Sequence, residues 1–179
     1  MIEAELVKIE DDKPWFEKQV KGDASETGLL KFIVPLMLKE FNDNKDYPQE
    51  GLEPYRASCP VLINKEGDMN PYEIKFSSDI KFNLMIRDMN PKNTQPTDVE
   101  DNLTVFLKGA PDRVHVRCSH IIEDNKAVAI TENHKIAIEN ANTLFGNMGE
   151  RVLGFSRLAL DCQKYKKSDY FGTKDWRSW

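Results

Sequence analysis

Apolar and polar residues alternate most clearly at 103–108, where the sequence reads LTVFLK. Such alternation predicts a β-strand with one buried face. Gly109 ends the pattern, and Pro111 suits the first turn of a helix because its missing N–H costs nothing there. The apolar residues of the strand are Leu103, Val105 and Leu107, and those predicted to continue the helix are Val114, Cys118 and Ile121.

Helical spacing also marks the residues after Asp23, with apolar positions recurring over 29–41. Asp23 followed by Glu26 resembles a capping box in which aspartate is the cap. On the residues alone, Glu26 is therefore a cap partner and nothing more. Pro35 lies inside the run and predicts that the helix ends or kinks near Val34.

The stretch 73–89 has the pattern of a β-hairpin. Ile74 and Phe76 alternate with polar residues, Ser-Ser-Asp at 77–79 supplies turn chemistry, and alternation resumes after the turn. The second strand is predicted to place Phe82, Leu84 and Ile86 on one face and Lys81, Asn83, Met85 and Arg87 on the other.

The C-terminal part predicts a short strand at 127–130, a helix and a final strand at 151–160. Thr131 is predicted to cap the helix, and Gly146 or Gly149 to end it. The apolar residues predicted along one side of this helix are Ile138, Ala141, Leu144, Phe145 and Met148.

Hairpins mixed with helices predict the α+β class, with a largely antiparallel β-sheet flanked by helices. Prolines and glycines at 42–72 and polar residues at 88–102 predict loops. A length of 179 residues fits a single domain spanning 1–179. A doubly wound nucleotide fold is not indicated, because neither GxGxxG nor GxxxxGK[ST] is present.

Composition limits the kind of protein that the chain can be. The chain is 40% hydrophobic and 31% charged, which is ordinary for a globular protein, and its formal charge of −5 argues against nucleic-acid partners. No apolar run approaches the roughly 18 residues that span a bilayer, and the acidic start is not a signal peptide. The scattered cysteines, Cys59, Cys118 and Cys162, indicate a reducing cytosolic setting and no metal framework. The histidines, predicted to be surface or packing residues, are His115, His120 and His134.

Lys108 is the first candidate for chemistry, because it lies at a strand end beside Gly109 and just before a helix start. A lysine in this position can meet a phosphate or carboxylate that also sees backbone N–H groups. Taken alone, the favoured interpretation is a solvated lysine at a turn.

Four stretches change that judgement. GDASET at 22–27, FSSDIKFN at 76–83, KGAPDR at 108–113 and GERVLGF at 149–155 resemble the nucleotide-binding domain of P-type cation-transporting ATPases in order and rough spacing. The residues of these stretches are most similar to those of the sodium/potassium-transporting group. The resemblance covers about 21–160, which leaves 1–20 and 161–179 as flanks that match poorly.

The resemblance implies an adenine pocket. The residue matching Phe76 stacks on the adenine ring, where stacking is worth roughly 1–3 kcal/mol, and the one matching Glu26 contacts the adenine amino group. The lysine matching Lys108 lies deep in the pocket, and Gly109 lets the ligand approach closely. Without the resemblance, Phe76 is more simply a core residue.

The same resemblance implies further contacts. Lys81 matches a second pocket lysine, and Asn83 stands where the sodium-pump group usually has glutamine. Ser78 matches a small polar residue beside the ligand. Arg151 matches an arginine that reaches the phosphates, where its fork of donors suits phosphate oxygens. The alternative for Arg151 is a surface salt bridge of little energetic value.

Absent motifs limit the expected role. No DKTGT motif is present, so the chain lacks the phosphorylated aspartate, and no catalytic residue is predicted. The resemblance therefore implies the ATP-binding insert of a larger membrane pump, on its cytoplasmic side, with the phosphorylation and actuator domains as partners. Mg²⁺ would arrive with ATP rather than occupy a protein metal site. The chain alone should not turn over ATP, and the transported ion is not determined by these residues.

Two alternatives stay open. The chain could be an interaction domain that keeps the fold but has lost nucleotide binding, which the departure at Asn83 and the long 42–72 region motivate. The loop at 88–102 would then be the partner surface. A free-standing kinase or hydrolase is disfavoured because no pair of base and nucleophile is visible.

Overall fold

The computed structural model describes residues 5–6, 19–41, 73–89, 103–161 and 163–165. The chain divides into two compact units, residues 1–58 and 59–179. The loop predicted at 42–72, nearly all of the one at 88–102 and most of the two flanks lie outside the described residues. The single domain predicted for 1–179 stays a prediction.

In the described part of the unit 1–58, two short strands precede a long helix. β1 (Glu5–Leu6) pairs antiparallel with β2 (Val20–Lys21), and α1 spans Ala24–Phe41. Asp23 caps this helix, because its side-chain Oδ1 accepts hydrogen bonds from the backbone N–H groups of Ser25 at 2.8 Å and Glu26 at 3.0 Å. The predicted role of Asp23 as the cap is confirmed.

α1 runs through Pro35 and ends at Phe41, so the helix does not end near Val34, and the alternative of a kink there stays a prediction. Proline removes one hydrogen-bond donor and crowds the carbonyl of the preceding turn, at a cost of about 3 kcal/mol in a helix interior. The residues after the proline keep their own N–H groups, so the helix continues beyond the missing bond.

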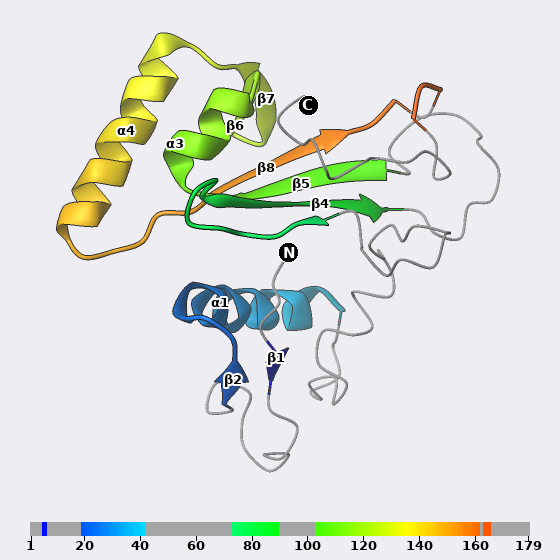
Figure 1. The fold of residues 1–179 in the computed structure, drawn as a ribbon, viewed down its shortest axis with the longest axis vertical. Helices are drawn as coiled ribbons and strands as arrows, with labels where there is room; N and C mark the ends of the chain where they lie inside the picture. Colours follow the sequence, from blue (N-terminus) through cyan, green and yellow to red (C-terminus); the bar gives the residue numbers. More distant parts are fainter. Residues whose placement is uncertain (1–4, 7–18, 42–72, 90–102, 162, 166–179) are drawn as a thin grey trace. The chain divides into compact units, whose positions relative to one another are not determined.

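In the unit 59–179, four described strands form an antiparallel sheet in the order β3-β4-β5-β8. Their bounds are Glu73–Ile74 for β3, Phe82–Asp88 for β4, Leu103–Gly109 for β5 and Gly154–Ala159 for β8. Figure 1 shows β4, β5 and β8 running side by side. The α+β class with an antiparallel sheet is confirmed, as is the hairpin, although its first strand ends before Phe76.

One face of the sheet carries a row of buried apolar residues on β4 and β5. Ile86 and Leu103 are 0% and 3% exposed, and Leu107 is 6% exposed, as the alternating pattern predicts. A short helix, α3 (Pro111–Val114), lies over this face and buries Val114 against Phe82 and Leu107. The cation of Arg117 lies 4.8 Å from the centre of the Phe82 ring. The core therefore forms where the predicted strand face meets the helix that follows it.

The predicted helix after Pro111 is shorter than its apolar spacing indicates. α3 gives way to the 3₁₀ turn η1 (His115–Arg117), and Ile121 lies in β6 (His120–Glu123), so its helical assignment is wrong. β6 pairs with β7 (Lys126–Ala129) in a hairpin. Asp124 and Asn125 turn this hairpin with φ angles of 48° and 61°, the positive values that favour such tight turns. Pairing of Ile121 with Val128 overrides the helical spacing.

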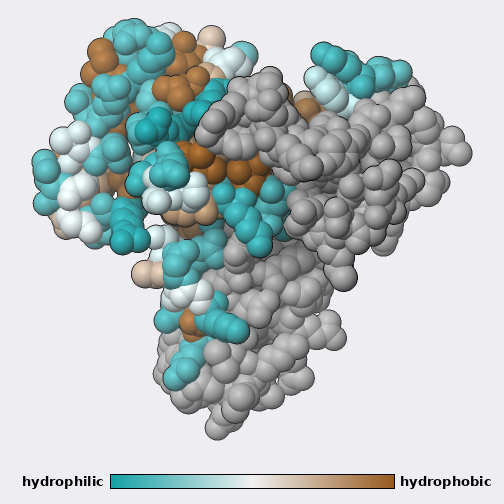
Figure 2. Space-filling model, in the orientation of Figure 1, coloured by the Kyte–Doolittle hydropathy of each residue, from teal (hydrophilic) through white to brown (hydrophobic). Residues whose placement is uncertain are grey.

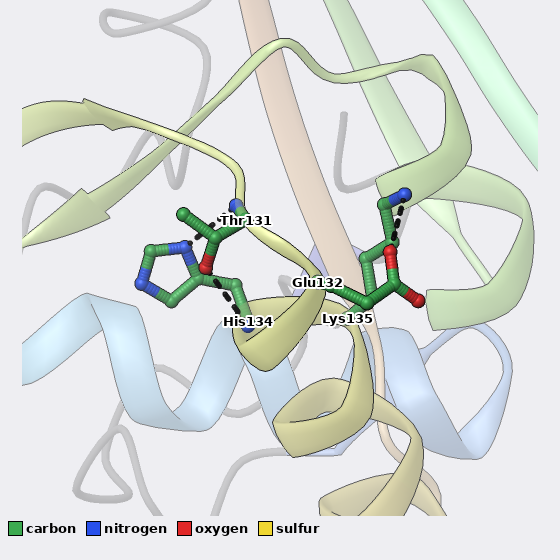
Figure 3. A network of polar contacts seen from close by, with 4 residues as sticks. All are labelled: Thr131, Glu132, His134 and Lys135. Carbon is green, nitrogen blue, oxygen red and sulfur yellow. Dashed lines mark hydrogen bonds and ion pairs between the residues drawn. The ribbon is translucent and has the colours of Figure 1, made fainter.

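A capping box starts α4 (Glu132–Asn147), the helix predicted after Thr131. The Thr131 hydroxyl accepts from the backbone N–H of His134 at 3.4 Å, and the His134 Nδ1 accepts from the backbone N–H of Thr131 at 3.1 Å. Lys135 pairs with Glu132 at 3.0 Å on the same turn (Figure 3). The predicted cap is confirmed, and His134 takes the place that glutamate usually has in such a box.

Gly149 ends the same helix, with a φ of +81°. Its N–H donates to the carbonyl of Gly146 at 3.0 Å, and the N–H of Glu150 donates to the carbonyl of Phe145 at 2.9 Å. This pair of bonds is a Schellman motif, for which glycine is favoured because it has no Cβ.

Apolar side chains of α4 remain exposed. Leu144, Phe145 and Met148 are 59%, 44% and 67% exposed, and no residue of α4 is buried. On the face drawn in Figure 2, brown hydrophobic residues stand among teal hydrophilic ones in the region where Figure 1 draws α4 and the β6–β7 hairpin. Within the described part of the chain, every helix is too short or too polar to cross a membrane.

We expect Thr131→Ala to destabilise the unit by about 1 kcal/mol, because it leaves the His134 N–H without its cap. Urea unfolding followed by circular dichroism measures this change. Thr143→Ala, at an exposed position inside the same helix, is the matched control and should be neutral or slightly stabilising. Equal losses in the two variants would contradict the capping role.

Gly109→Ala should destabilise the sheet by roughly 1–3 kcal/mol, because there is no room for a side chain. A Cβ at Gly109 would lie 2.5 Å from the Cβ of Phe82 and closer still to the carbonyl oxygen of Lys81. Thermal unfolding compares this variant with Gly146→Ala, whose added Cβ meets nothing within 4 Å. If Gly109→Ala is as stable as Gly146→Ala, the strands accommodate the added Cβ and the predicted steric conflict at position 109 is wrong.

Candidate functional site

Three of the four resembling stretches meet at one end of the sheet. Gly109 of KGAP pairs with Phe82 on β4 and with Gly154 on β8, and the backbone N–H of Ala110 donates to the carbonyl of Lys81 at 2.9 Å. In Figure 1 this is the end where β4 and β8 begin and β5 stops. The stretches at 76–83, 108–113 and 149–155 are thus brought together by strand pairing.

The turn before β4 presents Phe76 to solvent. The backbone N–H of Lys81 donates to the carbonyl of Ser77 at 2.9 Å, and the N–H of Ile80 lies 3.5 Å from the Ser77 hydroxyl. Phe76 is 62% exposed, so the alternative of a core phenylalanine is wrong. An exposed aromatic ring beside a fixed turn offers a flat apolar face for stacking.

Lys81 closes this turn in an unusual backbone conformation. Its φ is +62°, a region that residues other than glycine seldom adopt. Its carbonyl is held by the Ala110 N–H, so the turn is tied to KGAP at the point where β5 ends. Lys81 and Ser78 are both exposed on this turn.

A row of three side chains crosses the sheet near the same end. Asn83, Lys108 and Phe155 pair directly across β4, β5 and β8, so they share one face, opposite the face of Ile86 and Leu107. Lys108 is half-buried, and Phe155 is 55% exposed. Asn83 and Lys108, expected from the resemblance alone, are therefore neighbours, and the register adds Phe155, which the sequence marks only as a strand residue.

Glu73 joins this row through Asn83. The Asn83 Nδ2 donates to the Glu73 Oε1 at 3.1 Å. The Asn83 side chain is 4% exposed, and its Oδ1 has no hydrogen-bond partner among the described residues. Leaving a buried acceptor without a donor costs roughly 1–3 kcal/mol. The sequence alone does not mark Glu73, because only the pairing of β3 with β4 brings it beside Asn83.

The other predicted residues are placed less closely. Arg151 is exposed and lies just before β8, at the end of the sheet where Gly109 is buried. Glu26 belongs to the other unit, in the first turn of α1, and is 8% exposed. Arg151 is thus placed only by its position before β8, and Glu26 is described only within its own helix.

The described residues contain no group of three histidine, cysteine or acidic side chains that could hold a metal ion. Cys118 is a free thiol whose Sγ donates to the carbonyl of Val114 at 3.3 Å. The described residues at the sheet end offer an aromatic ring at Phe76, amino groups at Lys81 and Lys108, the amide of Asn83 and the carboxylate of Glu73.

The sequence of the chain is similar to those of known proteins. The family model for the cytoplasmic domain N of P-type ATPases matches residues 2–177. The alpha-3 subunits of the sodium/potassium-transporting ATPases of Gallus gallus and Homo sapiens are each 30% identical over 166 residues, or 93% of this chain. The alpha subunit of Drosophila melanogaster is 30% identical over 172 residues, or 96% of the chain.

The chain spans only 14% of the length of each of these relatives. The matched part nevertheless includes all the stretches that meet at the sheet end, since the family model runs from residue 2 to residue 177. The chain therefore belongs to the family of P-type ATPase cytoplasmic N domains.

Proposed function

We propose that the chain is the ATP-binding module of a P-type cation-transporting pump. Domain N is the nucleotide-binding domain of this family, and the relatives are sodium/potassium-transporting ATPases by name. The observation that carries the proposal is the pairing of Gly109 with Phe82 and Gly154, because it gathers an aromatic ring and several cations at one sheet end.

Each residue at this end has a distinct task in the proposal. The exposed ring of Phe76 stacks on adenine, and Lys108 on the neighbouring strand donates charged hydrogen bonds to the nucleotide. Lys81 and Ser78 on the turn add polar contacts, and Arg151 reaches the phosphates. Gly109 keeps the strand ends close together, so that the backbone can approach the ligand.

The contribution of this module to catalysis is positioning. It holds adenine and presents the γ-phosphate to a separate phosphorylation domain, which makes phosphoryl transfer effectively intramolecular. Mg²⁺ arrives with the triphosphate, since that ion normally keeps waters and binds phosphate oxygens. The partners are thus ATP and the phosphorylation and actuator domains, on the cytoplasmic side of an integral membrane pump.

The isolated module should bind ATP weakly. One stacked ring and a few charged contacts, set against the cost of association, correspond to a Kd on the order of 0.1–1 mM. The module itself should not hydrolyse ATP, because the proposed role includes no nucleophile or base.

We expect Phe76→Ala to weaken ATP binding about tenfold, since it removes the stacking face. Titration of ATP into ¹⁵N-labelled protein, followed by NMR, measures the Kd, and the shifts should cluster at residues 76–83 and 108–110. Phe145→Ala, which removes an exposed ring from α4, is the matched control and should leave the Kd unchanged. Shifts scattered away from the sheet end would favour the alternative of an interaction domain that has lost nucleotide binding.

Lys108→Ala should weaken ATP binding by roughly ten- to a hundredfold, since a hydrogen bond to a charged group is worth roughly 1.5–3 kcal/mol. The same titration at low and high salt should show the salt dependence shrinking in the variant. Lys126→Ala, at an exposed position on β7, controls for net charge. If both lysine variants lose the same affinity, the effect is general electrostatics and the pocket role of Lys108 is wrong.

A further inference from the structure

We propose that Glu73 is a positioning residue that makes the site prefer a base with an exocyclic amino group over one with a keto oxygen at the same ring position. The ligand class it selects is the 6-aminopurine nucleotides, against the 6-oxopurine nucleotides. This inference rests on the proposed ATP-binding function and deepens it. Its starting point is the hydrogen bond from the Asn83 Nδ2 to the Glu73 Oε1 at 3.1 Å.

The carboxylate of Glu73 decides which way the Asn83 amide faces. An amide side chain has a donor end and an acceptor end, whereas an ionised carboxylate only accepts. The donor end, Nδ2, must therefore face Glu73, and the acceptor end, Oδ1, faces the other way. Without a charged acceptor at Glu73, the two orientations of the amide would differ little in energy.

This orientation leaves the Asn83 Oδ1 as a buried hydrogen-bond acceptor in the candidate site. Asn83 is 4% exposed, and its Oδ1 has no hydrogen-bond partner among the described residues. It lies on the same sheet face as Lys108, its direct partner across β4 and β5. A buried acceptor without a hydrogen-bond partner favours a ligand that brings a hydrogen-bond donor and disfavours a ligand that brings a second acceptor.

Purine bases differ in this property. The 6-amino group of adenine donates hydrogen bonds, whereas the O6 of guanine or hypoxanthine accepts them. A fixed Oδ1 acceptor would accept a hydrogen bond from the 6-amino group of adenine. Against an O6 oxygen, the lone pairs of the two oxygens would face each other. Glu73 does not need to touch the ligand, since it acts by holding Asn83.

Binding of a base at Oδ1 requires neighbouring side chains to move, since this atom is covered in the structure. Lys108 has a flexible four-carbon stem and is only half-buried, so it can turn without a change in the strand backbone. The competing possibility is that the Lys108 ammonium donates to Oδ1 itself, in which case the site would not distinguish the two bases.

The test compares ATP with inosine triphosphate, which has a keto oxygen in place of the amino group, and with N⁶,N⁶-dimethyl-ATP, which keeps the ring but lacks the donor. Each is titrated into the full chain by NMR. Wild type should bind ATP at least about tenfold more tightly than either analogue. Glu73→Gln, which can present a donor or an acceptor to Asn83, should lower that ratio at least about threefold while retaining ATP binding.

Glu139→Gln removes the same charge from an exposed position on α4 and should leave the ratio unchanged. Asn83→Leu, of similar volume but without polar atoms, is the second variant and should lower the ratio as Glu73→Gln does. The resemblance also implies that Glu26 contacts the adenine amino group, so a preference for ATP in the wild type does not by itself point to Glu73. The change in the affinity ratio between wild type and variant is what assigns the preference to Glu73 and Asn83. Amide spectra of each variant establish that the strands remain folded.

The outcomes separate this inference from the proposed function. A ratio that stays the same in both variants, or equal wild-type affinities for ATP and inosine triphosphate, overturns the role of Glu73 and leaves ATP binding in place. Failure of the wild type to bind any of the three triphosphates overturns both. If Glu73→Gln does not fold, the result for Asn83→Leu decides.

Discussion

The backbone pairing of Gly109 with Phe82 and Gly154 is the constraint on which the candidate site depends. Only glycine fits at position 109, because an added Cβ would collide with Phe82 and with the carbonyl of Lys81. The N–H of Ala110 then bonds that same carbonyl, which joins the end of β5 to the turn before β4. Close packing of the backbone is thus what brings Phe76, on that turn, to the sheet end.

The two faces of the sheet have separate roles. The face with Ile86 and Leu107 packs against Val114 of α3, and this burial contributes to the stability of the unit. The opposite face carries Lys108, which is polar, beside Asn83, whose buried acceptor has no partner among the described residues. Two features that cost stability, this acceptor and the positive φ of Lys81, lie beside the site, where such strain is commonly found in proteins.

Local signals predicted much of the fold. The strand at 103–108, the hairpin at 73–89 and the caps at Asp23 and Thr131 are confirmed, because alternation and capping are read from neighbouring residues. Two predictions do not hold: an end of α1 near Val34, which was the alternative to a kink there, and the helical assignment of Ile121.

Both errors have the same physical origin. In each case one local feature, the proline in α1 or the helical spacing of Ile121, was outweighed by backbone hydrogen bonds of other residues. In α1, the hydrogen bonds that follow Pro35 carry the helix on to Phe41. In β6, pairing with β7 across the Asp124–Asn125 turn fixes Ile121 in a strand although its spacing from Val114 is helical.

The candidate site divides in the same way. Resembling stretches marked Phe76, Lys108 and Arg151 by sequence, and the structure adds that the stretches holding them meet at one sheet end. Glu73 lies outside the four resembling stretches, and Phe155, although it ends the stretch at 149–155, was predicted only as an apolar strand residue. Their positions beside Asn83 and Lys108 come from strand register, and a shift of register by one residue would turn either side chain to the opposite face.

The sequence by itself determined the class of fold, the capping residues and the kinds of side chain that a nucleotide site needs, because these depend on residue type and on spacing over a few positions. Tertiary structure alone decided which of those side chains are neighbours, how far each is exposed, and which end of the Asn83 amide faces Glu73. The physical reason is that hydrogen bonds between strands join residues far apart in the chain, and no local pattern encodes their register.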